Sequence, residues 1–366
     1  MTENEALLGL NAVPGLGSVR IRRLVEKFGS AQAVWKQRSA ETLCRTEGFG
    51  RDLADHVLNF DMRMFLENES ALIEKFRISI VTLFDDFYPP FLKEISCPPM
   101  VLYVMGRKEF LPEPGIAIVG SRRASYYGIS VARMLAGDLA RAGVTVISGM
   151  ARGVDTAAHA ASLEAGGKTI AVLGSGLACL YPKENEKLAR MISGNGCVIS
   201  EFPMSAGPSA RHFPRRNRVI SGLSRGVVVV EAASRSGALI TAECALEQGR
   251  EVYAVPGKVG HPQAFGVNAL IQQGAKLVMS AHDIFEDLQM TGAAVDDGVE
   301  CKDDWLSGLS RGERDVLALL SDEPLHIDEV IEKTSLNQQG VLSMLSQWEC
   351  LGRVKRLPGQ YFVKLK

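Results

Sequence analysis

The chain has 366 residues and is 46% hydrophobic, so it can form two or three domains around a substantial core. Its formal net charge is −1, which means that nucleic-acid binding would have to come from local patches. The seven cysteines include no CxxC pair, which argues against a zinc site and a disulfide framework. The acidic N-terminus does not resemble a signal peptide, and no apolar run is long enough to span a membrane. We therefore expect a cytoplasmic protein without a membrane contact.

Residues 1–75 have the pattern of short helices, and we predict a small helical domain there. Asn11–Ser30 reads NAVPGLGSVRIRRLVEKFGS, a glycine turn followed by a basic amphipathic helix, which is typical of a helix-hairpin-helix or SAM-like domain. Glu47–His56 resembles a second, more degenerate copy. Such a turn can offer backbone N–H groups to a phosphate. A helical bundle that only packs on its neighbour would give the same pattern.

An alternation of strands and helices begins near Phe76 and continues to residue 290. The predicted strands are Ile78–Leu83, Val101–Met105, Ile116–Val119, Val144–Ile147, Thr169–Leu173, Cys197–Ser200, Val227–Val230, Val252–Val255 and Lys276–Val278. The predicted helices between them are Gly128–Ala142, Thr156–Ala165, Glu184–Ile192, Leu239–Gln248 and Val267–Gln273. This alternation predicts an α/β fold with an extended Rossmann-like, parallel, doubly wound sheet over residues 76–290.

In a doubly wound sheet, ligands bind beyond the carboxyl ends of the strands, and four of the predicted turns at those ends contain glycine. The residues of these turns to which we assign DNA binding are Gly120, Ser121, Arg122, Arg123, Ser148, Gly149, Arg152, Gly174, Ser236 and Gly237. Together they would form a groove rich in N–H and guanidinium donors, which suits a phosphate backbone.

The stretch Arg211–Glu243 carries the strongest charge signal. It begins RHFPRRNR, with four arginines and no acid. We predict that these residues form a basic loop leading into a buried strand, with Phe213 kept extended by Pro214. The residues that we assign to binding of a polyanion are Arg211, Phe213, Arg215, Arg216, Asn217 and Arg218. The alternative is that the arginines lie on a solvated surface loop or pair with acids elsewhere.

The C-terminal part begins with a change of composition. Residues 291–304 are small and acidic and lack periodicity, so we predict a linker. From Trp305 onward, three short helices and a two-stranded hairpin predict a winged-helix domain over 305–366. Its expected recognition helix, Asn337–Glu349, contains no lysine or arginine, whereas the hairpin Arg353–Leu365 is basic. Docking to a protein and contact with a DNA backbone both stay open.

The motifs of common chemistries are incomplete. Gly167-Lys168-Thr169 resembles the end of a Walker loop, but Ser162 stands where the loop needs a glycine. Asp155 and His159 share a helix face and could be ligands, although a capping Asp and a packed His fit better without a third ligand. We therefore expect no catalytic residue, no metal and no cofactor.

Short motifs along the sheet region combine into one recognisable pattern. They are Gly120-Ser121-Arg122, Ser148-Gly149-x-Ala151-Arg152-Gly153-x-Asp155, Val172-Leu173-Gly174-x-Gly176 with Tyr181-Pro182, Phe213-Pro214-x-Arg216-Asn217-Arg218, Ser236-Gly237-x-Leu239 and Ala254-Val255-Pro256-Gly257. This pattern resembles the DNA-processing protein A family (DprA, also called Smf). The resemblance extends from about Ile116 to Leu277, and no position of the pattern is broken.

The resemblance implies a single-stranded-DNA-binding protein that protects incoming DNA and loads the RecA recombinase during natural transformation. It also implies a homodimer formed through the Rossmann domain, and no enzymatic activity. Arg122 and Arg216 or its neighbours would bind phosphates and Phe213 would stack on a base, which agrees with how single strands are held without sequence readout.

Two other functions remain as alternatives. The first is a nucleotide-processing enzyme of the phosphoribohydrolase type, but its PGGxGT turn is not reproduced at Arg235-Ser236-Gly237-Ala238. The second is a transcription regulator that acts through the winged helix, and the neutral recognition helix argues against it.

Overall fold

The computed structural model describes residues 1–37, 39–290, 309–321, 323–334, 336–351 and 353–365. The chain forms two compact units, and the second is built mainly from C-terminal residues. The predicted linker 291–304 lies outside the described residues, and so does the predicted start of the winged-helix domain at 305–308. The boundary predicted after residue 75 stays a prediction, because the N-terminal helices and the sheet belong to one compact unit.

The N-terminal residues fold into short helices, as predicted. They are α1 (Glu3–Ala12), α2 (Ser18–Phe28), α3 (Ala31–Trp35), α4 (Ala40–Cys44), α5 (Arg51–Leu58) and α6 (Met62–Phe76). A glycine turn joins α1 to α2, where Gly15 has a φ of 79°, and another joins α4 to α5, where Gly48 has a φ of 77°. Glycine adopts this left-handed conformation without steric cost. Both turns lie where the sequence places the helix-hairpin-helix pattern and its second copy, and that assignment stays a prediction.

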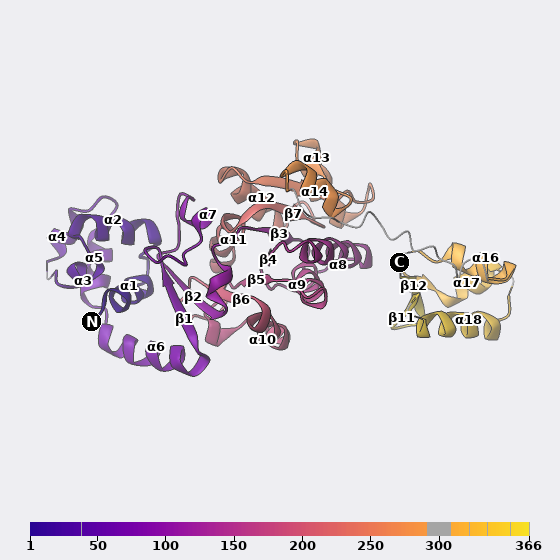
Figure 1. The fold of residues 1–366 in the computed structure, drawn as a ribbon, viewed down its shortest axis with the longest axis horizontal. Coiled ribbons are helices and arrows are strands. Elements are labelled where there is room, and N and C mark those ends of the chain that lie inside the picture. The colour runs from indigo at the N-terminus through magenta and orange to yellow at the C-terminus, as the bar shows by residue number, and fades with distance from the viewer. Residues whose placement is uncertain (38, 291–308, 322, 335, 352, 366) are drawn as a thin grey trace. The chain divides into compact units, whose positions relative to one another are not determined.

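A nine-stranded sheet forms the centre of the first unit, counted over the described residues (Figure 1). Its strands are β1 (Ile78–Thr82), β2 (Val101–Gly106), β3 (Gly115–Val119), β4 (Val146–Ser148), β5 (Thr169–Val172), β6 (Cys197–Ser200), β7 (Ser224–Val229), β8 (Glu251–Ala254) and β9 (Lys276–Leu277). The spatial order is β1-β2-β6-β5-β4-β3-β7-β8-β9. The chain moves outward from β3 to β6 and then returns to place β7 beside β3, so the doubly wound prediction is confirmed.

The sheet has the predicted parallel core, but it is mixed at the end that contains β2. β1 pairs with β2 in antiparallel orientation, and β2 pairs with β6 in the same way. The strands from β6 to β9 are parallel to one another. The segment between β1 and β2 contains only the short helix α7 (Pro90–Lys93), whereas a parallel connection needs a longer crossover.

Helices connect the parallel strands. They are α8 (Tyr126–Arg141), α9 (Val154–Glu164), α10 (Glu186–Asn195), α11 (His212–Gly222), α12 (Gly237–Glu247) and α13 (Phe265–Gln272), and α14 (Ala281–Asp287) follows β9. The sheet is anchored in an apolar core; for example, Val227, Val228 and Val229 of β7 are fully buried. β-branched side chains of this kind suit a strand that is covered on both faces.

Helix α11 is absent from the sequence prediction, which placed a basic loop at Arg211–Arg218. His212, Phe213 and Pro214 form the first turn of the helix after the N-cap residue Arg211. Proline fits this turn because its missing N–H group would have no intrahelical partner there. The expectation that Pro214 keeps Phe213 in a loop is therefore wrong.

The C-terminal unit has the predicted elements of a winged helix. They are α16 (Arg311–Leu319), β10 (Leu325–His326), α17 (Ile327–Thr334), α18 (Gln338–Cys350), β11 (Val354–Leu357) and β12 (Tyr361–Lys364). Trp348 of α18 and Phe362 of β12 are buried in its small core, and β11 and β12 form the expected antiparallel hairpin.

Candidate nucleic-acid interface

Two adjoining cavities open at the carboxyl ends of the parallel strands. The larger, of about 510 Å³, lies beyond β3 and β7, where the strand order reverses. The smaller, of about 160 Å³, includes the ends of β4 and β5 in its wall. The two cavities share Arg122, Arg123, Ala151, Phe213 and Arg216, and we call them together the sheet-edge pocket. Ligands of doubly wound sheets bind at this place.

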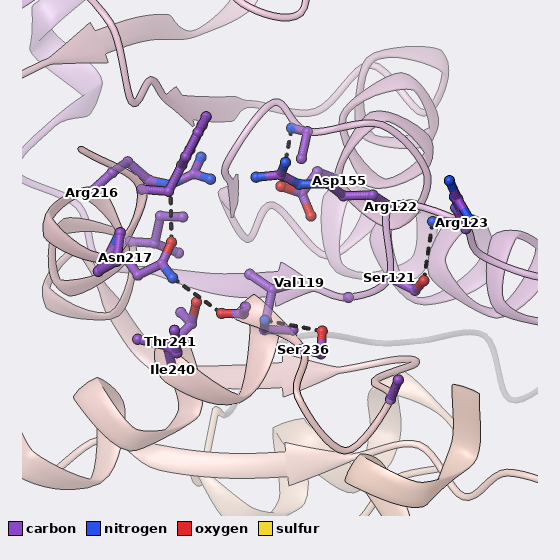
Figure 2. Close-up of a pocket in the computed structure, with 18 of the residues that line it drawn as sticks. Val119, Ser121, Arg122, Arg123, Asp155, Arg216, Asn217, Ser236, Ile240 and Thr241 are labelled. Atoms are coloured by element: carbon purple, nitrogen blue, oxygen red, sulfur yellow. Dashed lines mark hydrogen bonds between the residues drawn. The ribbon is translucent and has the colours of Figure 1, made fainter. Parts of the chain in front are cut away.

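The turn after β3 supplies exposed positive charge. The Ser121 hydroxyl is buried and accepts the backbone N–H group of Arg123 at 3.1 Å, which fixes the turn (Figure 2). Arg122 and Arg123 follow it and are both exposed. Neither guanidinium forms an ion pair within the part of the chain that the structure describes. Both are therefore available to an anion.

Arg216, on α11, lines the same pocket but is only 5% exposed. Its guanidinium donates to the carbonyl oxygen of Val172 at 2.8 Å and to that of Gly149, and its Nε donates to Asn217 Oδ1 at 3.1 Å. A Cβ atom at Gly149 would collide with this guanidinium. Burial lowers the pKa of Arg216 to about 10, so it stays charged at neutral pH. Arg216 thus ties α11 to the ends of β4 and β5.

Asp155 provides the negative charge of the pocket and lies beside Arg122 (Figure 2). Its carboxylate accepts the backbone N–H groups of Gly149 and Ala151, both at 3.2 Å. Burial raises the pKa of Asp155, while the nearby Arg216 and the two hydrogen bonds act in the opposite direction. The carboxylate therefore holds the turn after β4. It is not the helix cap that the sequence predicted, because Gly153 is the N-cap residue of α9 and no side chain caps this helix.

Phe213 forms an aromatic wall at the junction of the two cavities. Its ring is partly exposed and lies 6.2 Å from the ring of Tyr181, between centroids. The Cζ atom of Arg122 is 4.8 Å from the centroid of the Phe213 ring, which is a cation–π distance. A Cβ atom at Gly174 would lie 2.9 Å from the Phe213 ring, so glycine permits this close approach.

Arg152 also lines the smaller cavity, but a carboxylate already occupies its guanidinium. Its Nε and Nη2 atoms bind the two Glu184 oxygens at 2.6 and 2.7 Å in a bidentate pair. Both side chains are more than half exposed.

The structure brings most of the predicted site residues together. Those that line the pocket are Gly120, Ser121, Arg122, Arg123, Gly149, Arg152, Gly174, Phe213, Arg216, Asn217, Ser236 and Gly237. Ser148 does not, because it is buried and its hydroxyl donates to the Ile118 carbonyl at 2.6 Å. Arg211 is exposed at the start of α11 and lines neither cavity.

Arg215 and Arg218 point away from the sheet-edge pocket. Both bind one oxygen of the buried Glu201, at 3.3 and 2.5 Å. A helix turns by about 100° per residue, so arginines adjacent in sequence lie on different faces. For the arginines of the segment Arg211–Arg218, the sequence left open that they pair with acids elsewhere in the chain. Arg215 and Arg218 do so.

Some pocket residues were not among the predicted site residues. Tyr181, Ile240, Thr241 and Gln263 all line the cavities. Tyr181 belongs to the family-like motifs, so the sequence contained a signal for it. Ile240 and Thr241 lie in the first turns of α12. They line the pocket because the start of this helix is directed at the strand ends, and the sequence alone does not give that direction.

His159 is buried in the core and hydrogen-bonded to a neighbouring strand residue. Its Nδ1 atom lies 2.7 Å from the Thr169 hydroxyl, which donates its hydrogen to the Val146 carbonyl, so the ring N–H must be the donor to Thr169. Burial lowers the pKa of His159 to about 3, which keeps the ring neutral. No group of His, Cys, Asp or Glu that could hold a metal ion occurs among the described residues, and none of their helices is long and apolar enough to cross a bilayer.

Comparison with known families identifies the family to which the chain belongs. Residues 79–289 match the model described as DNA recombination-mediator protein A, and residues 302–360 match that of the DprA winged helix domain. The chain belongs to the DNA recombination-mediator protein A family. The matched region contains every element that lines the sheet-edge pocket.

Relatives agree with this assignment. Protein Smf of Escherichia coli K12 is 39% identical over 97% of this chain and 93% of its own length. DNA processing protein DprA of Streptococcus pneumoniae R6 is 43% identical over 63% of this chain and 82% of its own length. Among solved structures, S. pneumoniae DprA aligns with a TM-score of 0.67 at 36% identity, covering 78% of this chain and 98% of that one. Helicobacter pylori DprA, whose structure is described by its single-stranded DNA binding mode, aligns with a TM-score of 0.54 at 28% identity over 59% and 97% of the chains.

Proposed function

We propose that this protein binds single-stranded DNA in the sheet-edge pocket, protects the incoming strand and loads a RecA-type recombinase onto it during natural transformation in the cytoplasm. The observation that carries the proposal is the placement of two exposed arginines, Arg122 and Arg123, beside the partly exposed ring of Phe213. Neither arginine forms an ion pair with another described residue. Cationic contacts to the backbone combined with stacking of bases hold single strands without sequence readout. The single-stranded DNA binding mode described for the H. pylori relative supports the same function.

The pocket offers phosphate and base contacts on different elements. Arg122 and Arg123 provide charge, and the start of α12 at Gly237 offers backbone N–H groups at an exposed, sterically open position. Phe213 and Tyr181 offer rings, and Ile240 offers an exposed apolar side chain. Arg216 supports this arrangement as part of the pocket wall, because its Nε and Nη1 atoms already bind Asn217 and two carbonyl oxygens.

Binding without catalysis fits the titratable groups of the pocket. Asp155 holds backbone N–H groups, and the nearby His159 is buried and neutral. An enzyme of the phosphoribohydrolase type would need a carboxylate or imidazole free to act on a sugar. Release of free base from nucleoside monophosphates would support that alternative, and we expect none.

We further propose that the protein forms a homodimer through the β9 edge of the sheet. Large apolar side chains are exposed on neighbouring elements there: Leu246 of α12, Phe265 of α13, Leu277 of β9 and Met279 after it. Edge strands and exposed apolar patches of this kind favour association. Sedimentation of the full chain should show a dimer at micromolar concentration, and a monomer would contradict this part of the proposal.

The decisive test replaces the two free arginines. The double variant Arg122→Gln, Arg123→Gln should weaken binding of oligothymidylate by about 1–3 kcal/mol per lost charge-assisted contact, without a change in thermal stability. A matched control is Arg63→Gln, Arg190→Gln, which removes two exposed arginines that lie in helices α6 and α10 and pair with nearby glutamates. Equal affinities of the two variants would contradict DNA binding at the sheet-edge pocket.

A further inference from the structure

Helix α11 has a second basic face, and it borders a separate cavity. This cavity of about 420 Å³ is lined by Gly17, Ser18, Val19, Arg20, Arg23, Gly48, Cys97, Arg215 and Arg218. Its walls therefore combine the glycine turn before α2, the turn before α5 and the face of α11 opposite to Arg216. It shares no lining residue with the sheet-edge pocket. We call it the hairpin pocket.

The arginines that α2 contributes are held mainly by carbonyl oxygens. Arg20 donates from Nε to the Gly48 carbonyl at 2.9 Å and from Nη1 to the Gly15 carbonyl at 3.2 Å. Arg23 donates to the Glu47 carbonyl at 3.2 Å, and its Nη2 lies 3.4 Å from the exposed Glu47 carboxylate. Carbonyl acceptors orient a guanidinium without neutralising its charge, so this wall of the pocket stays positive.

The arginines that α11 contributes share a single carboxylate. Arg215 and Arg218 bind the same Glu201 oxygen, and Arg218 also donates to the Cys97 carbonyl. None of the residues that line the pocket, all of which the structure describes, is acidic. Among the described residues, these four guanidinium groups form ion pairs only with Glu47 and Glu201, which leaves a net formal charge of about +2 for the set.

The start of α2 adds backbone donors to these charges. Gly17 is the N-cap residue, and no side chain caps the helix. The first N–H groups of a helix have no intrahelical partner, and here they face a cavity lined by arginines. The apolar side chains of Ile21, Leu24 and Val25 are buried on the other side of the helix, which fixes its orientation.

From this geometry we propose that the hairpin pocket is a second phosphate-binding site, which holds the backbone of the same single strand beyond the sheet-edge pocket. The inference rests on the proposed function for the choice of ligand. Helix α11 lies between the two sites, and a helix with its side chains is about 10–12 Å across, so one strand can contact both. Phosphodiester oxygens match the two features of the cavity, guanidinium groups and helix N–H groups.

The test uses the double variant Arg23→Gln, Arg215→Gln in the full chain. These two arginines have exposed side chains, so the fold should persist. For an oligothymidylate of about 30 nucleotides, the slope of log affinity against log salt should fall by about 1.4, since each single-strand phosphate contact contributes roughly 0.7. An oligomer of about 6 nucleotides, short enough to occupy only one site, should bind the sheet-edge pocket with an unchanged slope. The control variant Arg22→Gln, Arg190→Gln removes two exposed, paired arginines outside the pocket and should behave as the parent chain does.

A second variant separates binding from folding. Ser18 is the first residue of α2, where a negative charge stabilises a helix. Ser18→Asp should therefore keep or raise the melting temperature while it weakens binding of the long oligomer several-fold. The inference would be overturned if the double variant Arg23→Gln, Arg215→Gln and the variant Ser18→Asp both kept the salt slope of the control. It would also be overturned if the two variants lost affinity for duplex DNA and kept their affinity for the single strand. Failure of the proposed function would differ, because the sheet-edge variant Arg122→Gln, Arg123→Gln would then leave both oligomers bound as tightly as before.

Discussion

The turn after β3 and helix α11 both bring arginines to the sheet-edge pocket, but they use them differently. Arg122 and Arg123 are exposed and form no ion pair within the described parts of the chain. Arg216 is 5% exposed, and its Nε and Nη1 atoms bind Asn217 and two carbonyl oxygens. The arginine-rich segment therefore contributes fewer exposed guanidinium groups to this pocket than the two-arginine turn. Burial and pairing, and not the number of arginines, decide how much charge a ligand meets.

The largest expected effect comes from removing the buried arginine. Arg216→Ala leaves the buried Asp155 without its main positive neighbour and leaves the Val172 carbonyl without its guanidinium donor. Each buried acceptor that is left without its donor costs about 1–3 kcal/mol of the free energy of unfolding. Urea denaturation measures this loss. Arg122→Ala is the matched control, and we expect its midpoint to stay near that of the parent chain. If Arg216→Ala kept full stability and lost only DNA affinity, Arg216 would be a ligand contact and not part of the scaffold.

The fold was largely predictable because its signals are local. Cys197–Ser200 was predicted with the same bounds as β6, and the valines before the Ser236-Gly237 turn matched β7 with a shift of a few residues. Short apolar runs bounded by glycines specify buried parallel strands well. The antiparallel pairing of β1 and β2 was missed because a strand's own sequence does not state its direction relative to its neighbours.

The site was predictable in part. The turn residues Gly120–Arg123 and Gly149 follow strands, so their position at the sheet edge follows from topology alone. The division of Arg215, Arg216 and Arg218 between two faces could not be predicted, because the segment was interpreted as a loop and a loop has no fixed periodicity. Recognition of Pro214 as a first-turn residue would have given helical spacing, and with it the separation of Arg216 from its neighbours.

A smaller effect, on DNA affinity, is expected from substitution of Phe213. This residue lines the pocket together with the exposed Arg122 and the buried Arg216. Its ring is partly exposed, packs closely against Gly174 and makes a cation–π contact with Arg122. Phe213→Ala should cost about 1–3 kcal/mol of single-strand affinity, the scale of one stacked base. The salt slope should stay unchanged, because no phosphate contact is lost. Phe213→Tyr keeps the ring and should retain affinity. Early melting of Phe213→Ala together with a reduced salt slope would show that the ring holds Arg122 in place and does not stack on bases.

The smallest effect is expected from a substitution that removes the ion-pair partner of an arginine in the pocket. Arg152 lines the smaller cavity, but Glu184 binds its guanidinium in a bidentate pair. Glu184→Gln removes the negative charge while it keeps the size of the side chain, so Arg152 would resemble Arg122 in having no ion pair. We expect the salt slope for oligothymidylate to steepen by at most one contact, roughly 0.7, with the melting temperature unchanged because an exposed pair contributes little to stability. Arg190 and Glu186 form a similar exposed pair outside the pocket, so Glu186→Gln is the control and should leave the slope as it is. An unchanged slope in Glu184→Gln would mean that Arg152 lies beyond the path of the strand, and that the free charge of the sheet-edge pocket comes from the turn after β3.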